Sequence, residues 1–414
     1  MSNETWVEAP LDHFLTRATY GFTNPMPTTS EGPYMVTAKD INDGRILYEQ
    51  ARRTSRDAFI EKLTDKSRPK IGDVLVTKDG TLGRIAIVDR PDVCVNQSVA
   101  VLQRNSSIRP AFLKLVLEEP RNHQRMLSEA EGSTIKHIYV TRLAKQPVRV
   151  PPLIVQDLVL SIITPLERKI ELNRKMNATL EAMARALFRD WFVDFGPTRT
   201  KMAGQTPYLS PDLWSLFPAR LYAEGKPEGW EVRPVGEVIE LFDHKRVPLS
   251  SQERAKRQGP YPYHGATSVM DHIDGYLFDE RLLLLGEDGS VAQADGRPFT
   301  QYVWGKLWVN NHAHVIKGLK VSVEQLKLFF DQVDIRPFVT GAVQPKLNQK
   351  NLRRVPYLRA SDGVHSAFDA AIGPLYDLIR HQNEESRTLA QTRDLLLPRL
   401  MSGELRVADL QEVS

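Results

Sequence analysis

The sequence predicts an α+β protein in which two mixed α/β domains lie in tandem, separated and joined by two long antiparallel helices that form a coiled coil. Three observations lead to this prediction. A long stretch in the middle of the chain carries a heptad pattern, and the same pattern returns near the C-terminus. The segments that precede these two stretches also repeat the same order of strand-like and loop-like motifs.

The first heptad pattern lies within residues 156–192, which the sequence predicts to be one long helix. Its seam residues recur at alternating steps of three and four, and this spacing places them on one face of a helix. The seam positions are Ile163, Leu166, Ile170, Asn173, Asn177, Leu180, Ala184 and Leu187.

The second pattern follows at a constant offset, because Ile372 stands 209 residues after Ile163 and the later positions keep that distance. Polar residues occupy the middle of both seams, so an antiparallel pair would place one polar layer against the other and fix the register. A single helix of this kind would be expected to pack only on its own domain, but the repeated offset favours a pair. The seam positions of the second helix are Ile372, Leu375, Ile379, Gln382, Leu389 and Leu396.

Composition narrows the class of protein. The chain has 414 residues, of which 41% are hydrophobic and 26% charged, as is typical of a soluble globular chain with two or more domains. No run of eighteen apolar residues occurs, no signal-peptide pattern opens the chain, and Cys94 is the only cysteine. We therefore expect no membrane span, no internal disulfide and a cytoplasmic location. The net charge of +4 permits an anionic partner without requiring one.

The elements of the first domain follow from local patterns. Alternating apolar residues on both sides of Asp79 predict a hairpin over 71–88, and a further strand is predicted over 93–102. Residues 111–128 are predicted to be helical with a break at Pro120. The segment 132–150 begins with a flexible Gly-Ser-Thr and closes with a strand at 147–150.

The second domain repeats this order. It opens with 230–242 and continues with an aromatic, glycine-rich loop at 259–265 and strands at 276–278 and 282–285. The segment 307–318 parallels 93–102, with Asn311 near the place of Asn96, and 341–346 parallels 132–137. The predicted domains are 1–152, a helix at 153–195, a linker with one short helix at 196–229, a second domain at 230–358, a helix at 359–405 and a tail at 406–414.

Sequence signatures of catalysis are missing from the chain. It has no G-x-x-x-x-G-K-[ST] phosphate loop, no G-x-S-x-G or H-E-x-x-H motif, and no strand that runs into a G-x-G-x-x-G turn. His312 and His314 stand two residues apart and could form a metal pair, but no nearby cysteine or third ligand supports this. We predict hydrogen-bonding histidines in a turn and no metal site.

Four segments carry a resemblance to a known family. They are IGDVLVTKDGTLG at 71–83, GSTIKHIYVTRL at 132–143, YPYHGATSVMDHIDGYLFDERLLLLGEDG at 261–289 and LWVNNHAHVIKG at 307–318. With these motifs in order and in duplicate, and with the two long helices, nearly the whole chain resembles the specificity subunit of a Type I restriction–modification enzyme.

The resemblance implies a division of labour. Each domain would be a target recognition domain that reads one half of a bipartite double-stranded DNA site, and the two helices would set the gap between the halves. Two modification subunits would dock on the chain and carry S-adenosylmethionine and the adenine methylation chemistry. Restriction subunits, with ATP-driven translocase and nuclease activity, would join them. The chain itself would be non-catalytic and would bind neither S-adenosylmethionine nor ATP nor magnesium.

Residues on the predicted loops are the candidates for DNA contact. Lysine and arginine would neutralise phosphates, and polar groups on loops would read base edges in the major groove. Each candidate also has an ordinary structural explanation, because Asp-Gly turns are common hairpin connections and Tyr263 could be a core residue. The predicted contacts are Lys78, Gly80, Thr81, Arg84, Lys136, His137 and Tyr139 in the first domain, and Tyr263, His264, Gly265, Gln344, Lys346 and Asn348 in the second.

Two other functions remain open from the sequence alone. The chain could be a single-chain DNA methyltransferase or nuclease with unfamiliar motifs, which would require a cofactor pocket. It could also be a coiled-coil scaffold with two protein-binding heads, which would not bind duplex DNA.

Overall fold

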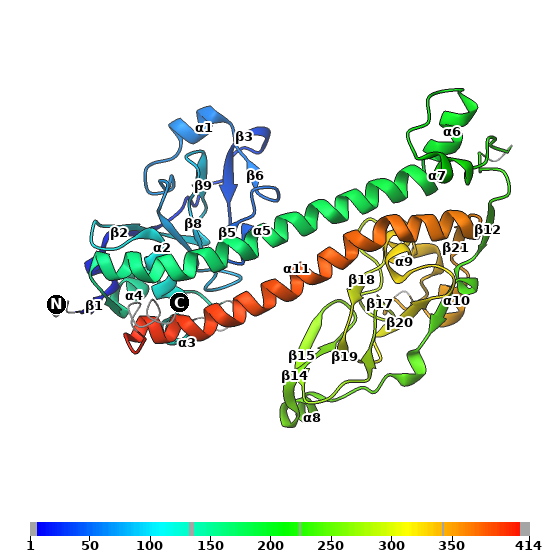
Figure 1. Ribbon diagram of the computed structural model, residues 1–414. Helices are drawn as coiled ribbons and strands as arrows, with labels where there is room; N and C mark the ends of the chain where they lie inside the picture. The colour runs from blue at the N-terminus through cyan, green and yellow to red at the C-terminus, as the bar shows by residue number, and fades with distance from the viewer. Residues whose placement is uncertain (1–5, 132–135, 223–224, 342, 406–414) are drawn as a thin grey trace. The chain divides into compact units, whose positions relative to one another are not determined.

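The computed structural model describes residues 6–131, 136–222, 225–341 and 343–405 (Figure 1). These residues form two compact units. The first is drawn from 1–172 and 385–414, and the second from 173–384. The predicted tail 406–414 lies outside the described residues. Helix α5 (Leu153–Phe192) and helix α11 (Asp362–Ser402) lie within the ranges predicted for the two long helices, and each contributes one part to each unit.

The first unit is organised around an antiparallel sheet of order β2-β10-β7-β8, covered by the helices α2 and α3. The strands are β2 (Leu15–Tyr20), β10 (Val99–Arg104), β7 (Val74–Thr77) and β8 (Ile85–Ile87). A second sheet, β6-β3-β9, contains a parallel pair, β3 with β9. Its strands are β6 (Arg52–Arg53), β3 (Thr29–Val36) and β9 (Val93–Val95).

Short elements complete the first unit. Strand β1 (Val7–Pro10) pairs with β11 (Pro147–Val150), and β4 (Ile41–Asn42) pairs with β5 (Arg45–Ile46). The chain breaks between two helices at Glu119, because the proline that follows it opens a new helix. The helices are α1 (Arg56–Glu61), α2 (Pro110–Glu118), α3 (Pro120–Ser128) and α4 (Val140–Lys145). The hairpin β7–β8 and the break at Pro120 confirm the predictions for these segments. The single strand predicted over 93–102 is two strands instead, β9 and β10, which belong to different sheets.

The second unit repeats the topology of the first. Its antiparallel sheet has the order β13-β20-β17-β18, and a second sheet of order β15-β14-β19-β16 contains the parallel pair β14 and β19. The strands of these two sheets are β13 (Ile239–Leu241), β20 (Ala313–Gly318), β17 (Leu282–Gly286), β18 (Thr300–Val303), β15 (Val269–Ile273), β14 (Gln258–His264), β19 (Lys306–Val309) and β16 (Phe278–Asp279).

The strand pair that opens and closes the second domain also has a counterpart in the first unit. Strand β12 (Glu231–Pro234) pairs with β21 (Pro356–Arg359), as β1 pairs with β11. The registers agree as well, because Val76 faces Ala100 and, 209 residues after Val76, Leu285 faces His314. The shared order and register confirm two tandem α/β units. The helices are α6 (Gly196–Met202), α7 (Pro211–Ser215), α8 (Ser251–Lys256), α9 (Val323–Phe330) and α10 (Gln349–Arg353).

Three local predictions for the second half of the chain are wrong. Residues 259–264 belong to strand β14 instead of a loop, because the strand pairs with both β15 and β19, and Gly265 lies in the turn that follows. The residue equivalent to Asn96 is Asn310, since each accepts the backbone N–H of the residue two positions later, from Ser98 and His312. The linker contains two short helices, α6 and α7, instead of one.

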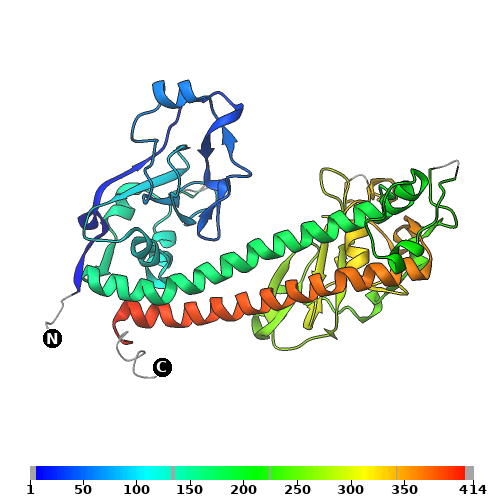
Figure 2. The same ribbon diagram turned by 45° about the horizontal axis from the view of Figure 1, so that its top comes forward.

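The long helices pair in opposite directions inside each unit. In the first unit Ile163 packs in one cluster with Leu397 and Leu400, and Lys169 Nζ lies 3.2 Å from Glu385 Oε2; Figure 2 shows the start of α5 beside the end of α11. In the second unit the Asn173 side chain donates to the Gln382 carbonyl at 3.4 Å. Later positions on α5 therefore meet earlier positions on α11.

The predicted seam residues lie on the covered faces of these helices. Those that are fully buried are Ile163, Asn173, Asn177, Ile372, Ile379 and Gln382. Those that are half-buried are Leu166, Ile170, Leu180, Leu187, Leu375, Leu389 and Leu396. None of the helices in the described parts of the chain is both long and apolar enough to cross a bilayer.

Candidate nucleic-acid interface

Each unit brings two distant loops together beside its antiparallel sheet. In the first unit the turn after β7 meets the segment before α4, where Asp79 and His137 form a β-bridge and the Ile138 N–H donates to the Lys78 carbonyl at 2.9 Å. We call residues 78–84 and 136–139 the first loop pair. Residues 132–135, which include the start of the predicted loop, lie outside the described residues.

The second unit has the same arrangement 209 residues later. Asp288 and Lys346 form the β-bridge, and the Leu347 N–H donates to the Glu287 carbonyl at 2.8 Å. We call residues 287–291 and 340–348 the second loop pair, of which Ala342 lies outside the described residues. The two loop pairs therefore share one backbone frame, and only their side chains differ.

A glycine with positive φ stands at the tip of each frame. Gly80 has a φ of 78° and Gly289 has a φ of 70°. Glycine adopts this conformation without strain, and a Cβ added at either position would meet nothing within 4 Å. Both tips are thus open backbone positions that a ligand can approach closely.

In the first loop pair some side chains bond to other parts of the protein, and others are exposed and available to contact a ligand. Lys78 Nζ donates to Asp79 at 2.8 Å, and Arg84 donates to the Ile41 carbonyl at 2.9 Å, so both are committed within the fold. Lys136 and Tyr139 are exposed, and the exposed Thr81 accepts a hydrogen bond from Thr77 through its backbone carbonyl.

Asp79 bonds to basic side chains on both loops of this pair, Lys78 on its own loop and His137 on the other. Burial works to raise the pKa of its carboxyl group, but hydrogen bonds from His137 and Lys78 outweigh burial and hold the pKa below its usual value. The ionised carboxylate therefore links the turn to the half-exposed ring of His137, which lies on the opposite loop.

In the second loop pair the predicted residues lie on the surface. Gln344 and Lys346 are exposed, and Lys346 Nζ lies 3.4 Å from Glu287. Asn348 is half-buried and caps α10, because its side-chain oxygen accepts the Asn351 N–H at 2.9 Å. Gln344 and Lys346 therefore remain available for contact, whereas the side-chain oxygen of Asn348 already has a structural partner.

The prediction of DNA contacts through Tyr263, His264 and Gly265 needs correction. Tyr263 is 1% exposed, and its hydroxyl accepts the Leu249 N–H at 2.9 Å. His264 is buried and bonds to Gln301 at 3.0 Å, and burial lowers the pKa of its ring. Gly265 is buried in the turn between β14 and β15. These residues belong to the core because the parallel pairing of β14 with β19 covers them.

His312 and His314 point in different directions and do not form a metal pair. His312 is half exposed, and its Nδ1 lies 2.5 Å from Asp288, whereas His314 is fully buried and bonds to Asp243. Asp243, Glu287 and His314 do stand close enough for a cation. The guanidinium of Arg246, 2.7 Å from Glu287 and 3.6 Å from Asp243, supplies positive charge there instead.

Sequence patterns missed one exposed aromatic beside the first loop pair. Tyr20, at the end of β2, is 38% exposed, and its ring faces Lys66 Nζ at 3.8 Å and Lys78 Nζ at 5.4 Å. A lysine over an aromatic face is held by the ring quadrupole. Lys66 belongs to a stretch rich in lysine and arginine at 51–70, but no local sequence pattern connects that stretch to Tyr20.

Comparison with known proteins explains the duplicated frame. A family model described as the Type I restriction modification DNA specificity domain matches residues 27–182 and 227–356, which is more than half of the chain. The chain belongs to this family. Its two family matches include most of the two units and both loop pairs, so this specificity subunit carries the family domain in duplicate.

Curated relatives and a solved structure agree with the family. The specificity subunit is 24% identical over 404 residues to the Type I restriction enzyme HindI specificity subunit of Haemophilus influenzae, covering 82% of this chain and 88% of that protein. It is 22% identical over 391 residues to the MjaIX specificity subunit of Methanocaldococcus jannaschii, covering 91% and 87%. The crystal structure of an S subunit from M. genitalium superposes with a TM-score of 0.55 at 16% identity, covering 97% of both chains, and shows the same fold.

Family membership confirms the predicted role. The protein is a DNA specificity subunit of the Type I restriction–modification class, which is a non-catalytic role. It also favours this role over the two alternatives left open by the sequence, a single-chain methyltransferase or nuclease and a scaffold that does not bind DNA.

Proposed function

We propose that the specificity subunit reads a bipartite DNA site, one half through each loop pair, and that α5 and α11 set the gap between the halves. The observation that carries the proposal is the repeated frame, in which Asp79 with His137 and Asp288 with Lys346 occupy matching bridges. One frame with two different sets of side chains suits a site whose halves have unlike sequences.

The available side chains have the chemistry that DNA reading needs. Lys136 and Lys346 can neutralise phosphates, which supplies affinity but little sequence information. Gln344 can pair with the edge of an adenine in the major groove, and His137 and Tyr139 offer further polar groups. The open backbone at Gly80 and Gly289 lets each turn approach the duplex closely.

The proposal extends to partners and cofactors. Two modification subunits would dock on the chain, and restriction subunits with translocase activity would join them. S-adenosylmethionine, ATP and magnesium would bind to those partners and not to this chain, in the cytoplasm. In support, the matched relatives are named as subunits of Type I restriction enzymes, and the sequence lacks the motifs of a phosphate loop and of a dinucleotide site.

The proposed reading of a split site is tested by mapping methylated adenines in cells with and without the intact specificity subunit. We expect a set of methylated positions that depends on this chain and shares two short sequences separated by a gap of constant length. A single continuous motif, or methylation that is independent of the chain, would contradict the proposal.

Replacing Lys136 by alanine is expected to weaken binding to the first half-site and to reduce the salt dependence of binding. Loss of one phosphate contact lowers the slope of log K against log salt by about 0.9. The measurement is the affinity of the complete complex for its duplex site between about 50 and 200 mM salt.

A matched control lies at the far end of α4. Lys145→Ala removes the same charge from the same unit, but Lys145 already pairs with Asp12 at 2.6 Å. The control should leave the slope unchanged. Equal slopes for wild type and Lys136→Ala would place Lys136 away from the phosphates.

A further inference from the structure

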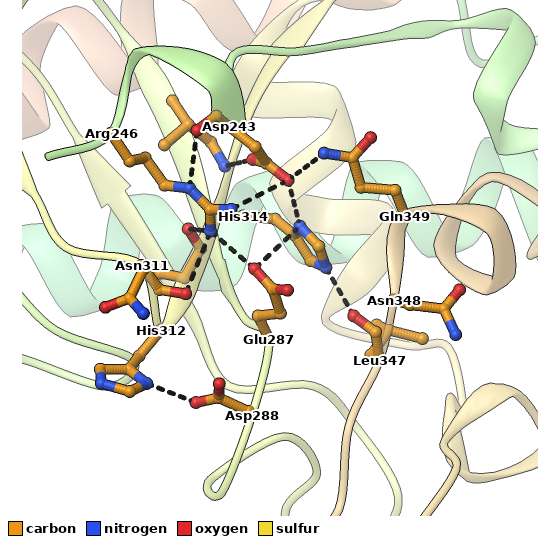
Figure 3. A network of polar contacts seen from close by, with 12 residues as sticks. Asp243, Arg246, Glu287, Asp288, Asn311, His312, His314, Leu347, Asn348 and Gln349 are labelled. Atoms are coloured by element: carbon orange, nitrogen blue, oxygen red, sulfur yellow. Dashed lines mark hydrogen bonds and ion pairs between the residues drawn. The ribbon is translucent and has the colours of Figure 1, made fainter. Parts of the chain in front are cut away.

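His314 lies beneath the second loop pair and is completely buried. It belongs to β20, in the interior of the second unit's antiparallel sheet, and both of its ring nitrogens face acceptors (Figure 3). Nδ1 lies 2.6 Å from a carboxylate oxygen of Asp243, and Nε2 lies 2.6 Å from the backbone carbonyl of Leu347.

This geometry shows how the ring is held on both sides. A carbonyl oxygen can only accept, so Nε2 carries a hydrogen and donates it to Leu347. On the other side of the ring, the Asp243 carboxylate takes hydrogen bonds from the Val315 N–H at 2.8 Å and from the Gln349 side chain at 2.7 Å. Burial works to raise the pKa of Asp243, but its contacts with His314 outweigh burial and hold that pKa below its usual value. His314 is therefore held between a carboxylate of the core and a carbonyl of the loop.

Charged side chains surround His314 and pair with one another. Asp243 comes from the short turn before α8, and Glu287, which follows β17, lies 3.8 Å from His314 Nδ1. Arg246 bridges these two carboxylates, and Lys346 approaches Glu287 from the loop side at 3.4 Å. Because both carboxylates are paired and hydrogen-bonded, most of their desolvation cost is offset.

The hydrogen bond to Leu347 fastens the loop to the core. Residues 340 and 346 exchange two backbone hydrogen bonds of 2.8 and 2.7 Å, which close the loop on itself. The Leu347 N–H then joins it to Glu287, and its carbonyl joins it to His314. His314 thus holds the peptide group between Leu347 and Asn348, on the same segment as Gln344 and Lys346.

The first unit secures its loop differently. The position that matches His314 is Ala100, which faces Val76 as His314 faces Leu285 and cannot donate from its side chain. There the histidine is on the loop itself, where half-exposed His137 pairs with Asp79. A buried histidine beneath the loop is therefore a feature of the second unit, and the shared frame does not require it.

We propose that His314 is a positioning residue for DNA reading by the second unit. Its Nε2–H holds the Leu347 carbonyl and thereby fixes Gln344 and Lys346 in the orientation that contacts the second half-site. This inference rests on the proposed function of the second loop pair. It adds a residue that does not itself touch DNA.

The test compares His314→Asn with His272→Asn in the full-length protein. Asparagine reaches only the position of Nδ1, so it can keep the bond to Asp243 but loses the bond to the Leu347 carbonyl, whereas His272 is an exposed residue of β15 that serves as the control. The buried carbonyl would be left without a partner, which should speed amide exchange of Lys346 and Leu347 about tenfold or more, with the first loop pair unchanged. The control variant should match the wild type.

DNA binding by the complete complex supplies the second readout. In the His314→Asn variant, discrimination between correct and altered second half-sites should fall about tenfold. Discrimination at the first half-site and the salt slope should stay unchanged, since no phosphate contact is removed. A general loss of stability would lower binding to every site equally and would not produce this split.

Three results would overturn the inference. Unchanged exchange of Lys346 and Leu347 would show that His314 does not hold the loop. A second contrary result would be faster exchange of these amides with unchanged discrimination at the second half-site, while Lys346→Ala still weakens DNA binding. The hydrogen bond from His314 would then have no effect on DNA recognition. If Lys346→Ala also has no effect, the loop does not contact DNA, and the proposed function fails together with the positioning role.

Discussion

Insertion of one heptad into each long helix is expected to lengthen the gap in the recognised DNA site by about three base pairs. A heptad adds about 10 Å of helix at about 1.5 Å per residue, and duplex DNA rises about 3.4 Å per base pair. Suitable positions are between Leu172 and Asn173 in α5 and between Glu384 and Glu385 in α11, where the two units divide. The new gap would be measured by mapping methylated adenines in cells that carry the variant.

The seam explains why a whole heptad should be tolerated. A heptad returns the helix to nearly the same face, with a drift of about 20°, so the buried rows headed by Ile163 and Ile372 stay continuous. The polar layer, in which Asn173 donates to the Gln382 carbonyl, remains in register because both helices lengthen together.

Two control variants separate length from folding. A heptad in α5 alone shifts the register against α11 and should destabilise the protein. Insertions of four residues in both helices rotate the seam and should abolish activity. Were the double-heptad variant to fold and methylate the parental gap, the proposal that the helices set the spacing would have to be abandoned.

The helices and the tandem units could be predicted because their signals are local and repeated. The seam from Ile163 to Leu187 can be recognised from the spacing of its apolar residues. The same spacing recurs 209 residues later, which supports the assignment of a helix in both places. The turns at Gly80 and Gly289 could also be predicted from local sequence. Both positions have a positive φ, which favours glycine over other residues.

The polar partners of the loop residues could not be predicted, because they come from distant segments. The local sequence around Tyr263 and His264 predicts a loop. In the structure these residues lie in β14, which pairs with β19, and no local pattern encodes that parallel pairing. His314 reads as a turn histidine, yet its two acceptors lie 71 and 33 residues away. The sequence therefore predicts where the loops are and which residue types they carry, but not which of those side chains are already bound within the fold.

Replacement of Trp191 by alanine is expected to cost the second unit about 3–5 kcal/mol of folding free energy. Trp191 is 1% exposed near the end of α5, and its ring centre lies 5.0 Å from that of Phe217 in the linker and 5.4 Å from that of Phe368 in α11. Alanine would leave a cavity where three segments meet. The effect is measured by urea unfolding, followed through amide exchange in residues 173–384.

Two comparisons test whether packing is the cause. Trp191→Phe keeps an aromatic ring and removes the indole N–H, which is buried and has no hydrogen-bond partner among the described residues, so it should cost much less than alanine. Met183→Ala changes a half-exposed residue of the same helix and should stay within about 0.5 kcal/mol of the wild type. Because the first unit shares none of this cluster, its amides should keep their protection in Trp191→Ala. An equal loss of amide protection in both units would mean that they unfold together. Binding to the second half-site could then not be weakened without weakening binding to the first.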